Sequence, residues 1–399
     1  MGMVSQRFAP FGTTVFAEMT ALANAHGAVN LSQGFPDFDG PEFAKRAVER
    51  AMAEGRNQYG RMQGLPELNR ALVGWWKRAT GMEVDGETQV TVTAGCTEAL
   101  AATFLGLINP GDEVILFEPY YDCYRAGVAM AGGVARTVRL RPPGAGEGAD
   151  GIVRGAFEFD AEELKRAFTG RTRAIVVNTP NNPTGKVFTR AELGLIAELC
   201  VGHGVVAITD EVYERLTFNE DRPHVRLATL PGMSERTITL SSLGKTYSLT
   251  GWKTGWAIAS RELSAAVRSA HQFLTFCSAI PMQMGAAEAI ERGEEYVEGL
   301  RKQLGEARDY LAGVLARVGF RVFMPEGTYF IMVDHTPVSG GRSDVEFCRW
   351  LTTEVGVAAI PPSVFYDDAE GGRRLARFAF CKRMETLRAA AERLERLRK

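Results

Sequence analysis

Arg173-Ala174-Ile175-Val176-Val177 and Val205-Val206-Ala207-Ile208-Thr209 are two short apolar runs, separated by a segment with helical spacing over Arg190 to Val201. Near-continuous apolar runs of this length are typical of parallel strands that are buried on both faces of a sheet. A strand, a helix and a second strand in this order form a βαβ unit. The stretch therefore predicts an α/β fold with a mainly parallel sheet covered by helices.

The same alternation of strands and helices extends on both sides of this unit. Gln89–Thr93, Glu113–Phe117 and Thr237–Leu240 have the character of strands. Thr97 to Ile108 is expected to form a helix with Thr97 as its N-cap. Residues 45–285 are therefore expected to form one continuous α/β unit.

The C-terminal third has a different pattern. Tyr296 to Val318 has the spacing of one long amphipathic helix, and shorter strand and helix patterns follow it. Such a mixture is typical of a smaller α+β domain. We therefore expect two domains: a large domain over residues 45–285, and a small domain that combines residues 1–44 with residues 286–399.

The composition argues against several classes of partner. The 399 residues carry a formal net charge of −2, which gives no electrostatic basis for binding nucleic acid or a membrane surface. No apolar run approaches the length of a membrane span, and Met1 to Pro10 lacks the apolar core of a signal peptide, so a cytoplasmic location is expected. The cysteines and histidines are scattered, so the sequence predicts neither disulfides nor a metal site.

Lys245 lies in Ser241-Ser242-Leu243-Gly244-Lys245-Thr246-Tyr247, just after a predicted strand. A lysine amine must lose its proton before it can attack a carbonyl group, and burial or nearby cations favour that loss. Taken alone, Lys245 is more simply interpreted as a solvated loop residue, because lysine is seldom buried. The residues at the other strand ends change this interpretation.

Ligands of open parallel sheets bind beyond the carboxyl ends of the strands, so residues at these ends are candidates for one site. Each strand end alone is also typical of a helix cap, a turn or a packed loop. Together they offer backbone N–H groups at a helix start, aromatic rings, amides, a carboxylate and an amine. This set suits pyridoxal phosphate, whereas no G-x-G-x-x-G motif follows a strand to favour a dinucleotide. The strand ends are Ala94-Gly95-Cys96-Thr97, Glu118-Pro119-Tyr120-Tyr121, Asn178 to Gly185, Asp210-Glu211-Val212-Tyr213 and the Lys245 loop.

The chain resembles the class I aminotransferases of pyridoxal-phosphate fold type I, almost from end to end. The motifs that carry the resemblance are Ser32 to Phe38, Asn57-Gln58-Tyr59, Asn181 to Lys186, Thr209 to Tyr213 and Ser242 to Lys245. The chain is most similar to kynurenine/glutamine aminotransferases and bacterial methionine aminotransferases, on the motifs Gln33 to Phe38, Tyr121 to Tyr124, His271-Gln272 and Pro325 to Phe330. The resemblance implies a large domain whose mainly parallel mixed sheet is sandwiched by helices, a smaller α+β domain, and a homodimer.

The resemblance also implies roles at the cofactor. Lys245 would form a Schiff base with pyridoxal phosphate and then move a proton between substrate and cofactor. Asp210 would pair with the pyridine nitrogen and keep it protonated. Tyr213 and Asn182 would contact the ring oxygen of the cofactor, and Tyr121 would stack on the ring face. The phosphate would be held by Cys96, Thr97, Ser242, Lys253 and Tyr59 of a second subunit.

At the substrate, the resemblance matches Arg377, in Leu375 to Phe380, to the arginine that binds the carboxylate, for which a guanidinium fork is suited. Gly34 and Asn182 are expected to add contacts. Five aromatic residues are candidates for the pocket wall, although each suits a core position equally well. They are Phe16, Tyr59, Tyr121, Phe276 and Tyr329, of which Tyr59 and Phe276 are expected to reach the neighbouring active site.

These residues predict an aminotransferase that moves the amino group of a neutral L-amino acid (methionine-like, aromatic or glutamine-like) to a 2-oxo acid by a ping-pong mechanism. Arg61 keeps an acidic substrate such as N-succinyl-diaminopimelate open. A second alternative is a β-lyase that cleaves cysteine S-conjugates or cystathionine on the same scaffold. A third is a regulator that senses an effector, which would be expected to carry a DNA-binding segment before the fold.

Overall fold

The computed structural model describes residues 4–144, 148 and 150–398, and the largest sheet among them has seven strands. The strand order is β2–β9–β8–β7–β6–β3–β4. β9 runs antiparallel to both of its neighbours, and the remaining pairs are parallel. The predicted α/β fold with a mainly parallel sheet is thus confirmed. The strands are β2 (Val90–Thr93), β3 (Glu113–Glu118), β4 (Val134–Arg139), β6 (Thr172–Asn178), β7 (Val206–Asp210), β8 (Thr237–Ser242) and β9 (Gly255–Ile258).

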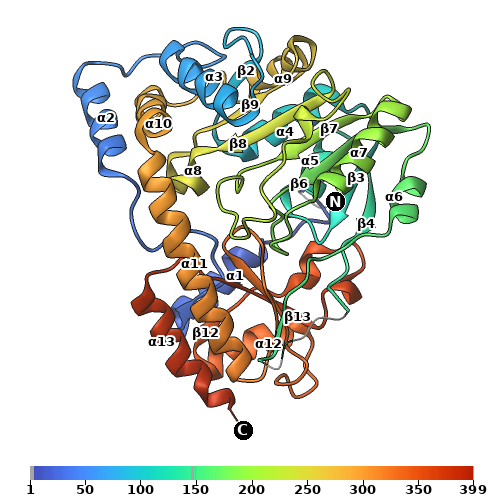
Figure 1. Cartoon of the computed structure of the whole chain (residues 1–399), viewed down its shortest axis with the longest axis vertical. Coiled ribbons are helices and arrows are strands. Elements are labelled where there is room, and N and C mark those ends of the chain that lie inside the picture. The colour runs from blue at the N-terminus through green and yellow to red at the C-terminus, as the bar shows by residue number, and fades with distance from the viewer. Residues whose placement is uncertain (1–3, 145–147, 149, 399) are drawn as a thin grey trace.

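Helices cover both faces of this sheet (Figure 1). Because successive residues of a strand point to opposite faces, each strand contributes apolar side chains to the core on either side. Val114 and Leu116 of β3 share a core cluster with α4, α5 and α9, whereas Ile115 and Phe117 share another with α6 and α7. Burial on both faces explains why the strands are apolar at every position. The helices are α4 (Gly95–Leu107), α5 (Cys123–Met130), α6 (Ala161–Ala167), α7 (Arg190–His203) and α9 (Arg261–Leu274).

Three further helices pack against the β2–β9 edge of the sheet, at the upper left of Figure 1. Their apolar faces enclose Val90 and Val92 of the edge strand β2, and Trp256 and Ile258 of its neighbour β9. This layer therefore covers one face of the sheet at its β2 end. The helices are α2 (Glu42–Ala53), α3 (Pro66–Thr80) and α10 (Ile280–Arg292).

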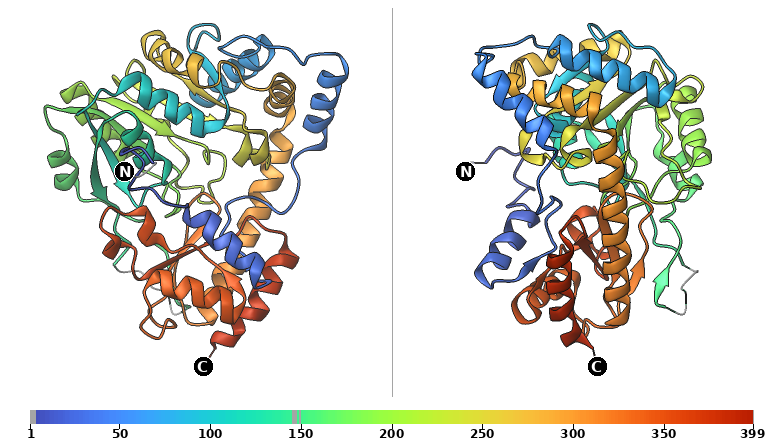
Figure 2. Two further views of the ribbon diagram at one scale, coloured as in Figure 1. Left: turned by 180° about the vertical axis from the view of Figure 1, so that it is seen from behind. Right: turned by 60° about the vertical axis from the view of Figure 1, so that its left-hand side comes forward.

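A four-stranded sheet, in the order β13–β11–β10–β5, forms the centre of the second part of the molecule. The long helix α11 (Glu294–Arg317) runs from the large sheet down to this part, as both views in Figure 2 show. α12 (Asp344–Trp350) and α13 (Met384–Leu394) complete its core. The strands are β5 (Ile152–Val153), β10 (Arg321–Phe323), β11 (Phe330–Asp334) and β13 (Leu375–Ala379).

The N-terminal segment packs against the C-terminal part. After α1 (Val15–Ala25), β1 (Val29–Asn30) pairs in parallel with β12 (Val357–Ala358). This pairing supports the predicted small domain, whose exact boundaries stay a prediction. β5 does not follow the predicted boundaries: its residues lie within 45–285 in the sequence, but it pairs with β10 of the small sheet. None of the described helices is long and apolar enough to cross a membrane.

The start of α4 differs from the prediction. The helix begins at Gly95, Ala94 is its N-cap residue, and no side chain caps it, so Thr97 is not the N-cap. Instead, Glu98 Oε2 accepts a hydrogen bond from the Ala94 backbone N–H at 3.1 Å. The N–H groups of Cys96 and Thr97 therefore fall in the first turn, where backbone donors have no partner within the helix. These donors are available to a ligand.

Candidate active site

A cavity of about 340 Å³ lies at the carboxyl ends of the parallel strands and is lined by both parts of the molecule. A volume of this size suits a small-molecule ligand. The structure brings twelve of the predicted site residues together in its wall. They are Phe16, Gly34, Cys96, Thr97, Tyr121, Asn182, Asp210, Tyr213, Ser242, Lys245, Lys253 and Arg377.

Three predicted residues do not line this cavity. Tyr59 and Phe276 lie on the surface, where they are 89% and 44% exposed and their ring centroids are 5.8 Å apart. Tyr329 is buried behind the wall, and its hydroxyl donates to the Gly34 carbonyl at 2.5 Å. A hydrogen bond directs its hydroxyl to the backbone of Gly34, which itself lines the cavity, so Tyr329 supports the wall from behind, and its expected contact with the substrate stays a prediction.

Lys245 lies in the short helix α8 (Leu243–Thr246), directly after β8. Its Nζ donates to the Gly34 carbonyl at 3.2 Å. Burial lowers the pKa of Lys245 to about 8; the charge of Arg377 acts in the same direction, and Asp210 opposes it. At pH 7 about a tenth of the amine is therefore neutral, far more than for a lysine with an ordinary pKa, and this neutral form is what a nucleophile or a general base requires.

Asp210 is the last residue of β7 and is 4% exposed. Its Oδ2 accepts a hydrogen bond from the Tyr124 hydroxyl at 2.7 Å, and the Val212 N–H lies 3.3 Å from Oδ1. Burial raises the pKa of this carboxyl group, because the surroundings disfavour its charge. A protonated pyridine nitrogen in the cavity would stabilise the ionised carboxylate, so Asp210 fits a pyridine cofactor.

The first turn of α4 and Lys253 form a cradle for an anion. A Cβ atom on Gly255 would lie 2.6 Å from Cys96 N, and one on Gly95 would lie 3.1 Å from Lys253 Nζ. The two glycines therefore allow the chain to approach closely here. Lys253 has a φ of 49°, a left-handed conformation that is uncommon outside glycine and is found at functional sites. N–H groups at a helix start together with an ammonium group suit a phosphate.

Arg377 lies in β13 and is 1% exposed. Its Nη1 donates to Asn182 Oδ1 at 2.9 Å and its Nη2 donates to the Ser32 carbonyl at 3.0 Å. The Phe330 ring centroid lies 4.0 Å from Cζ. Burial lowers the pKa of Arg377 to about 10, so the group keeps its positive charge at neutral pH. The guanidinium is thus fixed in the cavity wall by the N-terminal segment and the large sheet.

Two residues at this site have roles that the sequence did not predict. Tyr124, in α5, supplies the hydroxyl that contacts Asp210. Asn178, the last residue of β6, donates to the Asp210 carbonyl at 2.9 Å and accepts from the Asn182 N–H at 2.7 Å. The signal for Asn178 was its position as the polar end of an apolar strand. Tyr124 gave no such signal, because its contact with Asp210 depends on how α5 packs on the sheet.

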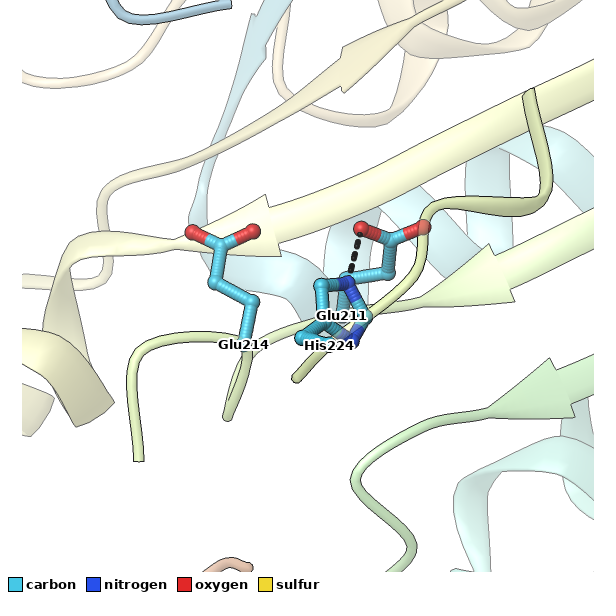
Figure 3. Close-up of side chains that lie close together, drawn as sticks. All are labelled: Glu211, Glu214 and His224. Atoms are coloured by element: carbon cyan, nitrogen blue, oxygen red, sulfur yellow. Dashed lines mark hydrogen bonds and ion pairs between the residues drawn. The ribbon is translucent and has the colours of Figure 1, made fainter. Parts of the chain in front are cut away.

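Glu211, Glu214 and His224 bring potential metal ligands within 4.8 Å of one another, close to the end of β7 (Figure 3). His224 Nε2 lies 2.8 Å from Glu211 Oε2. The Arg226 guanidinium also contacts Glu211, and its Nη2 lies 2.7 Å from Glu214 Oε2. Arg226 therefore supplies the positive charge that a metal ion would bring, and the cluster is a buried ion-pair network that holds the segment after Asp210.

A lysine amine, a buried carboxylate and an anion cradle at the strand ends define an α/β protein that fits pyridoxal phosphate. Residues 27–394 match the model of the family described as aminotransferase class I and II. The chain belongs to this family: it is an aminotransferase, and its cofactor is pyridoxal phosphate.

Full-length relatives agree with this assignment. The chain is 47% identical to a probable N-succinyldiaminopimelate aminotransferase of Mycobacterium tuberculosis, over 98% of each chain. It is 41% identical to the methionine aminotransferase of Escherichia coli, over 97% of this chain and 96% of the relative. The solved structure of an N-succinyldiaminopimelate aminotransferase from Mycobacterium tuberculosis superposes with a TM-score of 0.94, at 47% identity, over 99% of this chain and all of that one.

Proposed function

We propose that this aminotransferase takes the amino group from a neutral L-amino acid (methionine-like, aromatic or glutamine-like) and passes it to a 2-oxo acid. The observation that carries the proposal is the surroundings of Arg377. The ring centroids of Phe330 and Phe16 lie 4.0 Å and 5.2 Å from its Cζ. Among the described residues that line the cavity, the other lysines and arginines are Lys245 and Lys253, so the cavity wall contains no second arginine for an acidic side chain.

Within this proposal each end of the cavity has its own task. Pyridoxal phosphate, when bound, supplies a carbonyl group and a ring that accepts electrons. Arg377 binds the substrate carboxylate and thereby orients the α-carbon. The neutral amine of Lys245 takes the proton from that carbon, and Asp210 holds the negative charge opposite the ring nitrogen. The first turn of α4 and Lys253 hold the phosphate.

We also propose that two copies of the chain complete each site, with Tyr59 and Phe276 reaching the neighbouring cavity. Both rings are exposed on the monomer, and Phe273, three residues before Phe276 in the sequence, is 85% exposed. Exposed aromatic side chains that gather in this way are typical of an interaction surface. Tyr59→Phe, which removes only the hydroxyl, is expected to weaken cofactor binding without changing the oligomeric state in sedimentation.

A panel of amino donors with several 2-oxo acids tests the substrate proposal. The holoenzyme is expected to turn over methionine, glutamine or aromatic amino acids when a 2-oxo acid is present. With cystathionine or a cysteine S-conjugate and no acceptor, it is expected to release little pyruvate and ammonia. Turnover restricted to acidic donors would contradict the proposal. Release of pyruvate without an acceptor would favour the β-lyase alternative instead.

A second substrate class, an acidic amino acid such as N-succinyl-diaminopimelate, is favoured by the 47% identical relative, whose name gives that substrate. Arg61 is the candidate cation, because it lies two residues after the exposed Tyr59 and pairs with Glu87. If this class is correct, Arg61→Gln lowers turnover of N-succinyl-diaminopimelate and leaves methionine turnover unchanged. Glu87→Gln is the matched control, since it breaks the same ion pair and keeps the arginine.

A further inference from the structure

A buried histidine–carboxylate pair lies beside the phosphate cradle and has no part in the chemistry described above. His271, in the last turn of α9, is fully buried, and its Nδ1 lies 2.9 Å from Glu98 Oε1 in the first turn of α4. Glu98 is itself 9% exposed. A buried polar pair of this kind is costly unless every group is satisfied, so its other contacts are informative.

Both partners are hydrogen-bonded at their far ends. Glu98 Oε2 accepts from the Ala94 N–H at 3.1 Å, at the residue that leads into Gly95 and Cys96. His271 Nε2 lies 2.9 Å from the Met62 carbonyl oxygen. A carbonyl oxygen only accepts, so Nε2 carries a hydrogen and donates it. The pair therefore connects the phosphate cradle with the loop that carries Tyr59.

The pair holds one proton between Nδ1 and the carboxyl group. Because Nε2 is already a donor, either an imidazolium faces a carboxylate or a neutral ring faces a carboxylic acid. Burial lowers the pKa of His271, but the hydrogen bond to Glu98 and its charge outweigh burial and leave that pKa raised. The charge of Arg268, one turn earlier in the helix, acts in the opposite direction and lowers the pKa of His271. The Thr275 hydroxyl also lies 3.3 Å from Nδ1.

We propose that His271 is a positioning residue for the cofactor phosphate. Through Glu98 it fixes the backbone at Ala94 and so the donors of Cys96; through Met62 it fixes the loop that offers Tyr59 to the neighbouring site. The inference rests on the proposed position of the phosphate at the start of α4. It assigns a role in cofactor binding to two buried residues that do not line the cavity.

The test measures binding of pyridoxamine phosphate to the apoenzyme, because this form binds without a covalent bond to Lys245. His271→Phe keeps an aromatic ring but loses both hydrogen bonds, and Glu98→Ala loses the link to Ala94. Each is expected to raise the dissociation constant about tenfold, the effect of one or two lost hydrogen bonds. Glu98→Gln keeps an acceptor for the Ala94 N–H and a donor for Nδ1, so it is expected to stay within about threefold of the parent chain.

Two controls separate positioning from general destabilisation. His335 is an equally buried histidine that stacks on Phe347 in the small domain, so His335→Phe should leave the affinity unchanged. Pyridoxamine without the phosphate should bind His271→Phe and the parent chain alike. The inference is overturned if Glu98→Ala retains the parent affinity, if Glu98→Gln loses as much as Glu98→Ala, or if the loss extends equally to unphosphorylated pyridoxamine. A parent chain that binds pyridoxamine and pyridoxamine phosphate equally would instead overturn the proposed phosphate position.

Discussion

The two ends of the active-site cavity are built in different ways. Within one chain, the cofactor end is built at the strand ends of the large sheet: Asp210 ends β7, Lys245 follows β8, and the cradle at Cys96 follows β2. The substrate end is assembled from distant segments, since Arg377 of the small sheet is hydrogen-bonded to Ser32. The difference indicates that one sheet positions the groups that carry out the chemistry, whereas substrate choice depends on how several distant segments of the chain come together.

The largest expected effect is at the cofactor end. Lys245→Ala removes the amine that moves the proton, so turnover should fall by about 10⁴-fold or more. Binding of pyridoxamine phosphate should survive, because Asp210 and the cradle remain. Lys253→Ala is the comparison variant: excess cofactor should restore its turnover, since it keeps the catalytic amine. A Lys245→Ala enzyme with more than a tenth of the normal turnover would contradict this account.

Asp210→Asn should have the next largest effect, a fall in kcat of about 10³-fold, because a neutral amide cannot keep the ring nitrogen protonated. The side chain keeps its size, and the Tyr124 hydroxyl can still donate to the amide oxygen. Thermal unfolding should therefore change little. Steady-state kinetics measures the kcat of this variant. The control is Asp367→Asn, which alters a carboxylate that does not line the cavity, and its kcat should be near that of the parent chain.

At the substrate end, Arg377→Lys should raise KM for the amino acid about 30-fold to 100-fold. Lysine keeps the charge but loses the two-pronged contact with a carboxylate and the hydrogen bonds to Asn182 and Ser32. The affinity for pyridoxamine phosphate should change far less than KM, because Arg377 is linked to the cofactor end only through its hydrogen bond to Asn182. An equal loss in both measurements would show that the two ends are not independent.

The smallest effect is a pH dependence at the cofactor end. The pKa of Lys245 is lowered to about 8, so the neutral fraction increases about tenfold from pH 6 to pH 7 and levels off above pH 8. The rate at which the apoenzyme captures pyridoxal phosphate should follow this curve in stopped-flow absorbance. A rate that continues to rise to pH 10 would mean that the lysine keeps its ordinary pKa.

Most of the cofactor end could be predicted from the sequence, because apolar runs reveal the strands and parallel strands end at one edge. Asp210 and Lys245 each follow such a run. The contact between Tyr124 and Asp210 could not be predicted, since it depends on how α5 packs on the sheet. β5 was missed because its two residues are too few to form a pattern, and only its partner β10 defines it.

The substrate end was less predictable for a related reason. Arg377 was found through the resemblance and not through local patterning, because its partners are hundreds of residues away in the sequence. Tyr329 was assigned to the pocket wall, but its hydroxyl is directed to the Gly34 backbone. Tyr59 and Phe276 lie outside the cavity of their own chain, so their proposed role depends on contacts between copies and not on local sequence patterns.

The most direct test of the central claim is to reduce the holoenzyme with borohydride and map the labelled peptide by mass spectrometry. Reduction makes the bond between a lysine and pyridoxal phosphate permanent. The account predicts one phosphopyridoxyl group per chain, on Lys245. A label on Lys253, or no label on a protein saturated with cofactor, would contradict it.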